Sequence, residues 1–281
     1  MQLSSSSRQI GLPLWVAALL VIFAPGARAT QTENLNIRVL PTPGEVKIDG
    51  KADDWDLTGG VFACGDVENL REKMAGWVHT MYDAENLYVP ARWRDETPLS
   101  NPGSSAGDHG WNGDCLQLRI IAAPEMRVTT DKGRKEPPVC WVTAWRDRDG
   151  IDVVDLAFPK GGGTDMRDAQ DAGAKQEFTV SEDGAGYVQE IALPWSLLVE
   201  GGITPRPGER IVFSVEPNFK TTSNYHVSIK DIFRPGVTPN RVFTFMAYNC
   251  WGYGLLMDRN DVEPQKLRLA DRREFEVQMH Q

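Results

Sequence analysis

Residues 110–120, which read GWNGDCLQLRI, decide the fold. Their second half, 116–120, alternates between apolar and polar residues, which is the period of a strand with one buried face. Their first half is a loop of Gly, Asn and Asp that carries one large aromatic residue, Trp111, with no apolar neighbour beside it. The stretch therefore predicts a strand that begins at a polar rim bearing a tryptophan.

The same alternation recurs along the chain between turns rich in Gly, Pro, Asn and Asp. Convincing helical periodicity is rare, and one helical turn is expected at 194–198, where a proline stands at an early helical position. Many short strands with frequent turns predict an all-β fold, an antiparallel β-sandwich with long loops. Strands are expected at 46–48, 76–82, 87–94, 116–120, 140–145, 151–158, 187–193, 211–215, 242–247 and 254–257.

Two departures from this pattern lead to further expectations. Pro90 lies within the strand expected at 87–94 and has no N–H to donate, so that strand should lie at a sheet edge or be bulged there. Residues 161–175 are rich in Gly, Asp and Ala, and we expect them to form a long surface loop outside the core.

The first 29 residues have the pattern of an export signal. Residues 12–24 are apolar throughout, too short to span a bilayer comfortably, and are followed by Pro25-Gly26. The small-x-small sequence at 27–29 suits cleavage after Ala29, although an uncleaved membrane anchor is the alternative. We expect a signal peptide at 1–29, one domain at 30–260 and a charged tail at 261–281 in a periplasmic or secreted protein without a membrane attachment.

Charge and motif content exclude several classes of function. The chain has 30 Lys and Arg against 39 Asp and Glu, and such an acidic protein is a poor ligand for nucleic acid or an anionic membrane face. The sequence contains no GxSxG, HExxH or P-loop, and no GxGxxG after a strand, so we predict no catalytic activity. The four cysteines lack metal-ligand spacing, and both two disulfides and four buried thiols remain open.

Four segments, taken in order, resemble the pattern of family 9 carbohydrate-binding modules. These four motif segments read VKIDGKADDW at 46–55, YDAENLYV at 82–89, WNGDCLQL at 111–118 and YVQEIALPW at 187–195. The resemblance covers most of residues 40–260 and extends to the wider DOMON-like superfamily. It implies a jelly-roll type β-sandwich without catalytic residues, whose partner is a glycan or oligosaccharide.

The resemblance also points to binding residues. In these modules the tryptophan of the third segment stacks on a sugar ring, and a glutamate six residues later bonds the sugar hydroxyls. Trp111 is therefore expected to stack, and Gln117 replaces the glutamate with an amide that donates and accepts without charge assistance. Arg92 and Trp251 are further candidates, Trp251 as a second aromatic wall between glycines. The alternative for Trp111 is that it folds back and caps the sandwich.

Two cofactors and a third kind of function remain open. Family 9 modules can carry structural calcium, and Asp49, Asp53 and Asp54 offer the hard oxygen ligands that Ca²⁺ prefers. The same superfamily includes haem b-binding electron-transfer subunits of ethylbenzene dehydrogenase-like enzymes, whose RW-x-D-x-T pattern is similar to residues 92–97. A surface sandwich that binds another protein is the third alternative. Axial haem ligands by type would be His79, Met81, Met126, Lys220, His226 and Lys230, without a convincing pair among them.

Overall fold

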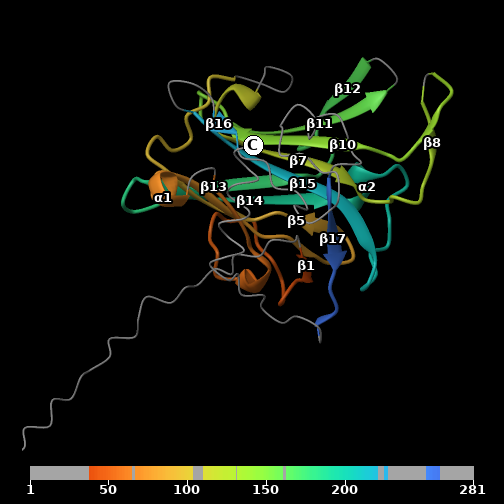
Figure 1. Ribbon diagram of the computed structural model, residues 1–281, viewed down its shortest axis with the longest axis horizontal. Coiled ribbons are helices and arrows are strands. Elements are labelled where there is room, and N and C mark those ends of the chain that lie inside the picture. Colours follow the sequence, from red (N-terminus) through yellow and green to blue (C-terminus); the bar gives the residue numbers. More distant parts are fainter. Residues whose placement is uncertain are drawn as a thin grey trace, which may run out of the picture. The chain divides into compact units, whose positions relative to one another are not determined.

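The computed structural model describes residues 38–64, 67–103, 110–130, 132–160, 163–220, 225–226 and 251–259, of which 67–68, 159–160, 163–168 and 225–226 are described by their backbone alone. This part of the chain is almost wholly β, as expected (Figure 1). Its short helices are η1 (Leu57–Gly59), α1 (Val67–Leu70), η2 (Gly110–Asn112) and α2 (Trp195–Leu198). The helical turn expected after Pro194 is thus confirmed as α2.

The described strands are numbered in chain order. They are β1 (Arg38–Pro41), β2 (Val61–Ala63), β3 (Met74–Val78), β4 (Met81–Tyr82), β5 (Asn86–Tyr88), β6 (Ala91–Asp95), β7 (Cys115–Ile121), β8 (Val128–Thr129), β9 (Lys135–Glu136), β10 (Cys140–Arg146), β11 (Asp152–Lys160), β12 (Gly163–Asp168), β13 (Lys175–Val180), β14 (Gly186–Pro194), β15 (Arg210–Phe219), β16 (Tyr225–His226) and β17 (Gly252–Leu256).

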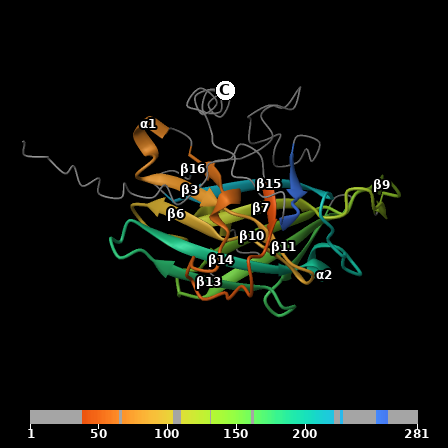
Figure 2. The same cartoon turned by 90° about the horizontal axis from the view of Figure 1, so that it is seen from below.

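The strands form two layers that share β1. In sheet A, β14 pairs with β13 on one side and with β5 and β6 on the other. Beyond β5 the sheet continues through β4 to β1, and beyond β6 it continues through β3 to β2. Sheet B runs in the order β12, β11, β10, β7, β15 and β17, then reaches β1. Figure 2 shows β13 and β14 on one side of the sandwich and β7 and β15 on the other. The pairs are antiparallel except β1 with β17 and β1 with β4, which confirms the predicted sandwich.

The hydrophobic core lies between the sheets because alternate residues of each strand point inward. Leu116, Leu118 and Ile120 of β7 are fully buried in one cluster with side chains of sheet A. In that cluster the rings of Trp93 and Tyr187 stack with centroids 5.1 Å apart. The alternation in 116–120 therefore predicted the inner face of this strand correctly.

Residues 42–60, the cover segment, lie against the outer face of sheet A. Trp55 is buried against Met81, Tyr88 and Ala192, and the cluster also includes partly buried apolar residues of the cover segment. Residues 46–48 were expected to form a strand, and the structure corrects this, because they run in the cover segment without ladder partners among the described strands.

Glu190 on β14 fastens the cover segment to sheet A. Its carboxylate accepts hydrogen bonds from the backbone N–H of Asp49 (2.7 Å) and Gly50 (2.6 Å) and from the indole Nε1 of Trp55 (2.6 Å). Burial raises the pKa of Glu190. Gly50 has φ +76°, and a Cβ there would lie 2.3 Å from Thr179 Oγ1, so only glycine suits this contact. The first and fourth motif segments thus meet at a structural contact.

Two expectations about strands are settled by the pairing. Residues Gly163–Asp168 form β12, which pairs with β11, so the surface loop expected at 161–175 is wrong for this part. Pro90 lies between β5 and β6, but the register with β14 is the same on both sides of it, with Tyr88 opposite Ala192 and Ala91 opposite Gln189. Both strands also have neighbours on both sides, so the expectation of an edge strand or a bulge at Pro90 is wrong. The expected strand at 242–247, the signal peptide and the tail lie outside the described residues.

None of the helices in the described part of the chain is long and apolar enough to cross a membrane.

Candidate functional site

Trp111 lies on η2, immediately before β7, and its side chain is exposed. Its exposed fraction is 43%, whereas the tryptophans Trp145 and Trp195 are almost completely buried. It belongs to none of the hydrophobic clusters of the described residues. The rim that the sequence predicted therefore carries an aromatic ring that is accessible to a ligand.

The loop around Trp111 is held by close backbone packing at its two glycines. A Cβ on Gly110 would lie 2.5 Å from the ring of the buried Trp145, and a Cβ on Gly113 would lie 2.6 Å from the backbone of Asn101. The Asn101 Nδ2 donates hydrogen bonds to the carbonyls of Gly110 (2.5 Å) and Asp114 (3.0 Å). The two glycines of the GWNG sequence are thus required by sterics, and the backbone that carries Trp111 is held in place.

Asp114 ties this loop to two other parts of the chain. Its buried carboxylate accepts hydrogen bonds from the backbone N–H of Ser100 (2.6 Å) and of Lys220 (2.5 Å). The Lys220 Nζ donates to the carbonyl of Asn112 at 3.2 Å. Trp111 therefore sits on a platform that three segments stabilise, which lowers the entropy lost when a ligand binds.

Asp114 also faces a second buried carboxyl group, that of Asp95 at the end of β6. Burial, and then the negative charge of Asp95, raise the pKa of Asp114 to about 8, and burial raises the pKa of Asp95. Two adjacent buried carboxyl groups disfavour the state in which both are ionised, so one of them is expected to keep its proton at neutral pH. The platform under Trp111 is therefore sensitive to pH.

Gln117 lies in a polar row on the outer face of sheet B. The register places Asp155, Thr143, Gln117 and Glu216 side by side across β11, β10, β7 and β15. The Gln117 Nε2 donates to Thr143 Oγ1 at 3.3 Å, and Asn218 Nδ2 donates to Gln117 Oε1 at 3.3 Å. Gln117 is 4% exposed, so its amide forms hydrogen bonds with its neighbours in this row and is almost inaccessible to solvent.

The row next to it adds a buried cation. Arg119 of β7 is buried, and its guanidinium lies 5.6 Å from the ring centroid of Trp141 on β10. Arg119 is paired in register with Ser214, and Glu216 is the next outward-facing residue on β15. Buried polar and charged side chains thus continue across the outer face of sheet B on β7 and β15.

The other two binding candidates lie elsewhere. Trp251 is 1% exposed and packs against Ile121 and Val212, so it presents no ring face to solvent as the structure stands. Arg92 lies on the outer face of sheet A, in register with Trp77 and Val188. Gln117 lies on β7 of sheet B, and Trp111 lies on the loop directly before β7. Arg92 lies on sheet A and is therefore separated from both residues.

The described residues do not fit the calcium site considered from the sequence. They contain no group of three His, Cys, Asp or Glu side chains that could hold a metal ion. Asp49 is hydrogen-bonded to the backbone N–H and the ammonium group of Lys51, and Asp54 accepts from the backbone N–H of Lys47. These acids stabilise local turns of the cover segment.

The haem ligand candidates do not converge either within the described residues. The Sδ of Met81 accepts a hydrogen bond from Asp56, Met126 is exposed, and the Lys220 ammonium group bonds to Asn112. His79 packs against the ring of Trp55 with centroids 5.8 Å apart. The side chain of His226 and all of Lys230 lie outside the described residues. Met81, Lys220 and His79 thus make other contacts within the part of the chain that the structure describes.

The three described cysteines, Cys64, Cys115 and Cys140, are buried. Cys115 packs on the outer face of sheet B with Trp145 and Val153, whereas Cys140 is in the core. These two cysteines therefore lie on opposite faces of the sheet, although both are in strands as expected. Cys250 lies outside the described residues.

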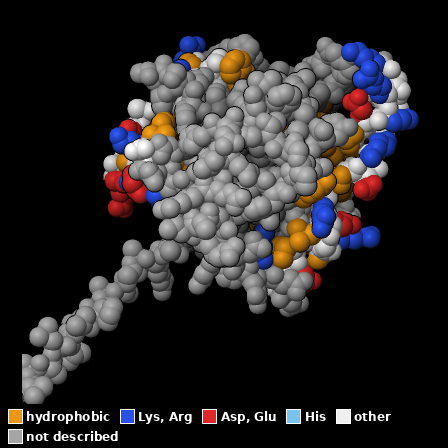
Figure 3. Space-filling view, in the orientation of Figure 1, with side chains coloured by type: hydrophobic (Ala, Val, Ile, Leu, Met, Phe, Trp, Pro, Cys, Tyr) orange, Lys and Arg blue, Asp and Glu red, His pale blue; other side chains and the backbone are white. Residues whose placement is uncertain are grey.

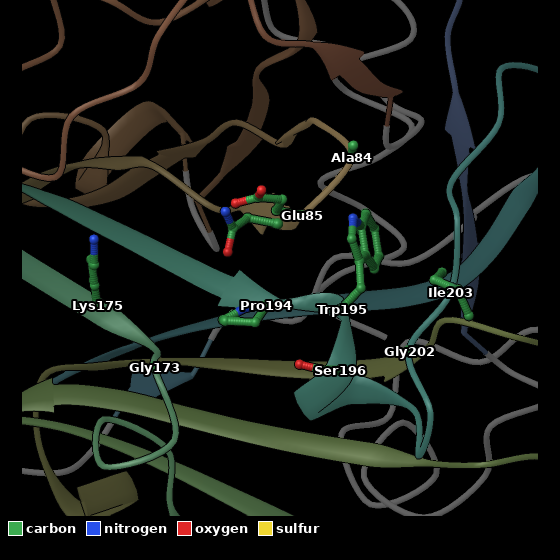
Figure 4. Close-up of a pocket in the computed structure, with 10 residues that line it drawn as sticks. Ala84, Glu85, Gly173, Lys175, Pro194, Trp195, Ser196, Gly202 and Ile203 are labelled. Carbon is green, nitrogen blue, oxygen red and sulfur yellow. The ribbon is translucent and has the colours of Figure 1, made fainter.

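A cleft of about 490 Å³ lies at the end of sheet A (Figure 4). Glu85 and Asn86 line it from the β4–β5 turn, and Pro194, Trp195 and Ser196 line it from the start of α2. The Trp195 ring is buried and its Nε1 donates to the carbonyl of Asp83 at 3.1 Å, which makes it a structural residue. The cleft includes none of the predicted binding residues.

The segment that carries β8 and β9 is basic on the face of the molecule that Figure 3 shows, and it is called the basic ribbon. Figure 3 shows Lys and Arg side chains gathered where Figure 1 places β8. Arg127 donates to the carbonyls of Pro124 and Met126, and the Lys135 Nζ donates to Thr129 Oγ1. These cations hold the ribbon together, so the ribbon has a structural explanation.

Fold and site together define a β-sandwich with an exposed aromatic ring at the end of a polar sheet face. No family model matches the sequence, and no curated protein matches it. Among solved structures, the chain is similar to a proposed carbohydrate-binding protein from Bacteroides uniformis, with a TM-score of 0.50, 9% identity and coverage of 80% of this chain and 100% of the other.

The chain also matches a family 9 carbohydrate-binding module from Caldicellulosiruptor kristjanssonii in two complexes. With cellotriose the TM-score is 0.49, at 14% identity and coverage of 82% and 100% of the two chains. With glucose the TM-score is 0.47, at 14% identity and coverage of 81% and 100%. At these identities the likeness to the Bacteroides protein shows a shared fold, and the ligand has to be argued from the residues.

Proposed function

We propose that this protein is an exported, non-catalytic carbohydrate-binding protein that holds a glycan at the rim of sheet B. The observation that carries the proposal is the Trp111 ring, 43% exposed on a loop that Gly110, Gly113 and Asp114 fix in place. Sugar C–H groups pack on an aromatic face, and a ring on a fixed loop gives this contact with little loss of entropy.

The polar row supports the same class of ligand. Gln117 and Thr143 supply amide and hydroxyl groups of the kind that bond sugar hydroxyls, and both lie on the strands next to the Trp111 loop. The resemblance of the third motif segment assigns stacking to Trp111 and hydroxyl recognition to Gln117. Export rests on the apolar run at 12–24, and N-terminal sequencing of exported protein should begin at Thr30 rather than Met1.

Replacing Trp111 with alanine should weaken glycan binding by about 1–3 kcal/mol, which is the scale of one aromatic contact. A glycan array followed by calorimetry should find a ligand of the wild type with a dissociation constant of roughly 10–1000 μM, because sugar hydroxyls lose water before they bond. Since Trp111 is exposed, the variant should keep the wild-type melting temperature.

The matched control is Tyr253→Ala. Tyr253 is an exposed aromatic residue of sheet B, 38% exposed, and it pairs with Val212 at the opposite end of β15 from Asn218. This variant should bind the glycan like the wild type. A screen that finds no glycan, or equal affinities of the wild type and Trp111→Ala, would reject the proposed function, and unfolding of Trp111→Ala would make Trp111 a structural cap.

A further inference from the structure

A second cavity, of about 330 Å³, lies on the outer face of sheet A, away from the rim that carries Trp111. The register places Arg92 between Trp77 of β3 and Val188 of β14 on this face. The lining residues are Ala52, Trp77, Arg92, Trp93, Arg94, Ser181, Tyr187 and Val188. Two arginines line the cavity, of which Arg94 is paired with Asp183, together with indole rings and hydroxyl groups, and none of these residues belongs to the site at Trp111.

Arg92 has no counter-charge in this cavity. The structure shows no hydrogen bond or ion pair between its half-buried guanidinium and any described residue, and burial lowers the pKa of Arg92. The nearby acids are engaged: Asp183 bonds to Arg94 at 2.7 Å, and Glu190 holds the cover segment. A partly desolvated cation without a partner is costly, and a bound anion would remove that cost.

His79, on the same face, does not add a second positive charge. It is fully buried and neither ring nitrogen has a partner in the described residues. Burial, and then the positive charge of Arg92, lower the pKa of His79 to about 3, so the ring is neutral at physiological pH. The local field in the cavity is therefore that of one positive charge.

The shape and lining of the cavity limit the kind of anion. Its volume is at the lower end of ligand pockets, about 300–1000 Å³, and suits one ring rather than a chain. Trp77 and Val188 offer apolar surface to a ring, Ser181 offers a hydroxyl group, and the planar guanidinium of Arg92 matches a carboxylate.

We infer that this cavity binds a single acidic sugar unit, a hexuronate, whose carboxylate is held by Arg92 and whose ring packs on Trp77. The sugar class rests on the proposed function, whereas the carboxylate rests on Arg92. The protein then has two glycan contacts on different sheets. One stacks a sugar ring on Trp111, and the other binds a carboxylate at Arg92.

Ligand-detected NMR titration with D-glucuronate and D-galacturonate tests this inference. We expect binding with a dissociation constant on the order of 1 mM, typical of one small ligand with one charged contact. Methyl glucoside, which has the ring without the carboxylate, and acetate, which has the carboxylate without the ring, should each bind at least tenfold more weakly in this cavity.

The decisive variant is Arg92→Gln, which removes the charge and should weaken hexuronate binding at least tenfold. The matched control is Arg94→Gln, because Arg94 lines the same cavity but is already paired with Asp183, and it should change the affinity less than threefold. Thermal unfolding of both arginine variants checks that they fold.

Equal hexuronate affinities of the wild type and Arg92→Gln would overturn the inference, and so would no binding to the wild type. Acetate that competes as well as hexuronate would overturn the sugar class. If a neutral glycan fails to bind but hexuronate binding depends on Arg92, the proposed function at Trp111 fails and this inference stands. If a neutral glycan binds through Trp111 but hexuronate binding does not depend on Arg92, this inference is rejected and the proposed function stands.

Discussion

Replacing Glu190 with alanine is expected to lower the free energy of unfolding by about 3–5 kcal/mol. The buried carboxylate accepts three hydrogen bonds, from the N–H groups of Asp49 and Gly50 and from the indole of Trp55. Bonds to a charged acceptor are worth about 1.5–3 kcal/mol each, and the variant leaves its donors without that acceptor. Chemical denaturation followed by circular dichroism measures the change.

A carboxylate in a different setting provides the control for Glu190→Ala. Asp183 bonds to Arg94 at 2.7 Å, but its side chain is 53% exposed, so Asp183→Ala should change the stability far less than Glu190→Ala. If Glu190→Ala is as stable as Asp183→Ala, the cover segment is not fastened by Glu190, and the structural explanation of the first and fourth motif segments fails.

The second large effect is a loss of stability as the pH rises from about 4 to about 8. Burial and Asp95 raise the pKa of Asp114 to about 8 in the folded state, above its value in an unfolded chain. The folded protein therefore binds more protons than the unfolded chain across this window, and its free energy of unfolding falls as the protons leave. The stability from this pair is complete below pH 4 and is lost by about pH 8.

Asp95→Asn should weaken this dependence. The asparagine amide donates permanently to Asp114, and its oxygen can still accept from the Thr97 N–H, which bonds to Asp95 Oδ1 at 2.8 Å. Because burial still raises the pKa of Asp114, thermal unfolding from pH 4 to 9 should show a smaller loss of stability toward pH 8 than in the wild type, and the variant should exceed the wild type by on the order of 2 kcal/mol above pH 8. A variant that keeps the wild-type slope would contradict the proton retained by the pair.

Other titratable groups near this carboxyl pair, and His79 elsewhere in the molecule, also affect how stability depends on pH. Tyr187 and Cys115 face the carboxyl pair, but burial raises the pKa of both groups far above the window. Glu96 adds its charge to that of Asp95. His79 has the opposite sign: its pKa is lowered to about 3, so stability falls as the pH drops below about 6.5, and Asp95→Asn should retain this acid limb.

The fold followed from the sequence wherever one face of a strand is buried. Alternation at 116–120 located the inner face of β7, and Pro90 indicated an interruption within a strand. The pattern failed for β12, because Gly and Asp at 163–168 give no strand preference and the pairing with β11 decides the structure. It also failed at 46–48, where partly buried residues pack on a sheet without joining it.

The candidate site was predictable in part. An aromatic residue between Gly and Asn on a polar loop indicated exposure, and Trp111 is exposed. Trp251 had the same glycine-rich surroundings, yet it is buried against Ile121 and Val212, because local sequence does not show which distant strands cover a residue. The separation of Arg92 from Gln117 depends on which sheet each strand joins, and alternation alone does not encode that.

The first, second and fourth motif segments have structural explanations, whereas the third motif segment is the one proposed to bind the glycan. Glu190 joins the first and fourth segments, and in the second Asp83 accepts from the N–H groups of Glu85 and Asn86 and from the Tyr88 hydroxyl. In the third, Asp114 and the glycines fix the loop while the Trp111 ring is exposed.

The central claim is that the Trp111 ring contacts the glycan, and indole N–H signals in a nitrogen-15 NMR spectrum test it most directly. The chain has nine tryptophans, and Trp111→Phe assigns the signal of interest. Titration with the glycan found by the array should shift the Trp111 signal in a saturable way and leave those of the buried Trp145 and Trp195 in place. Saturable binding that leaves the Trp111 signal unmoved would contradict the account.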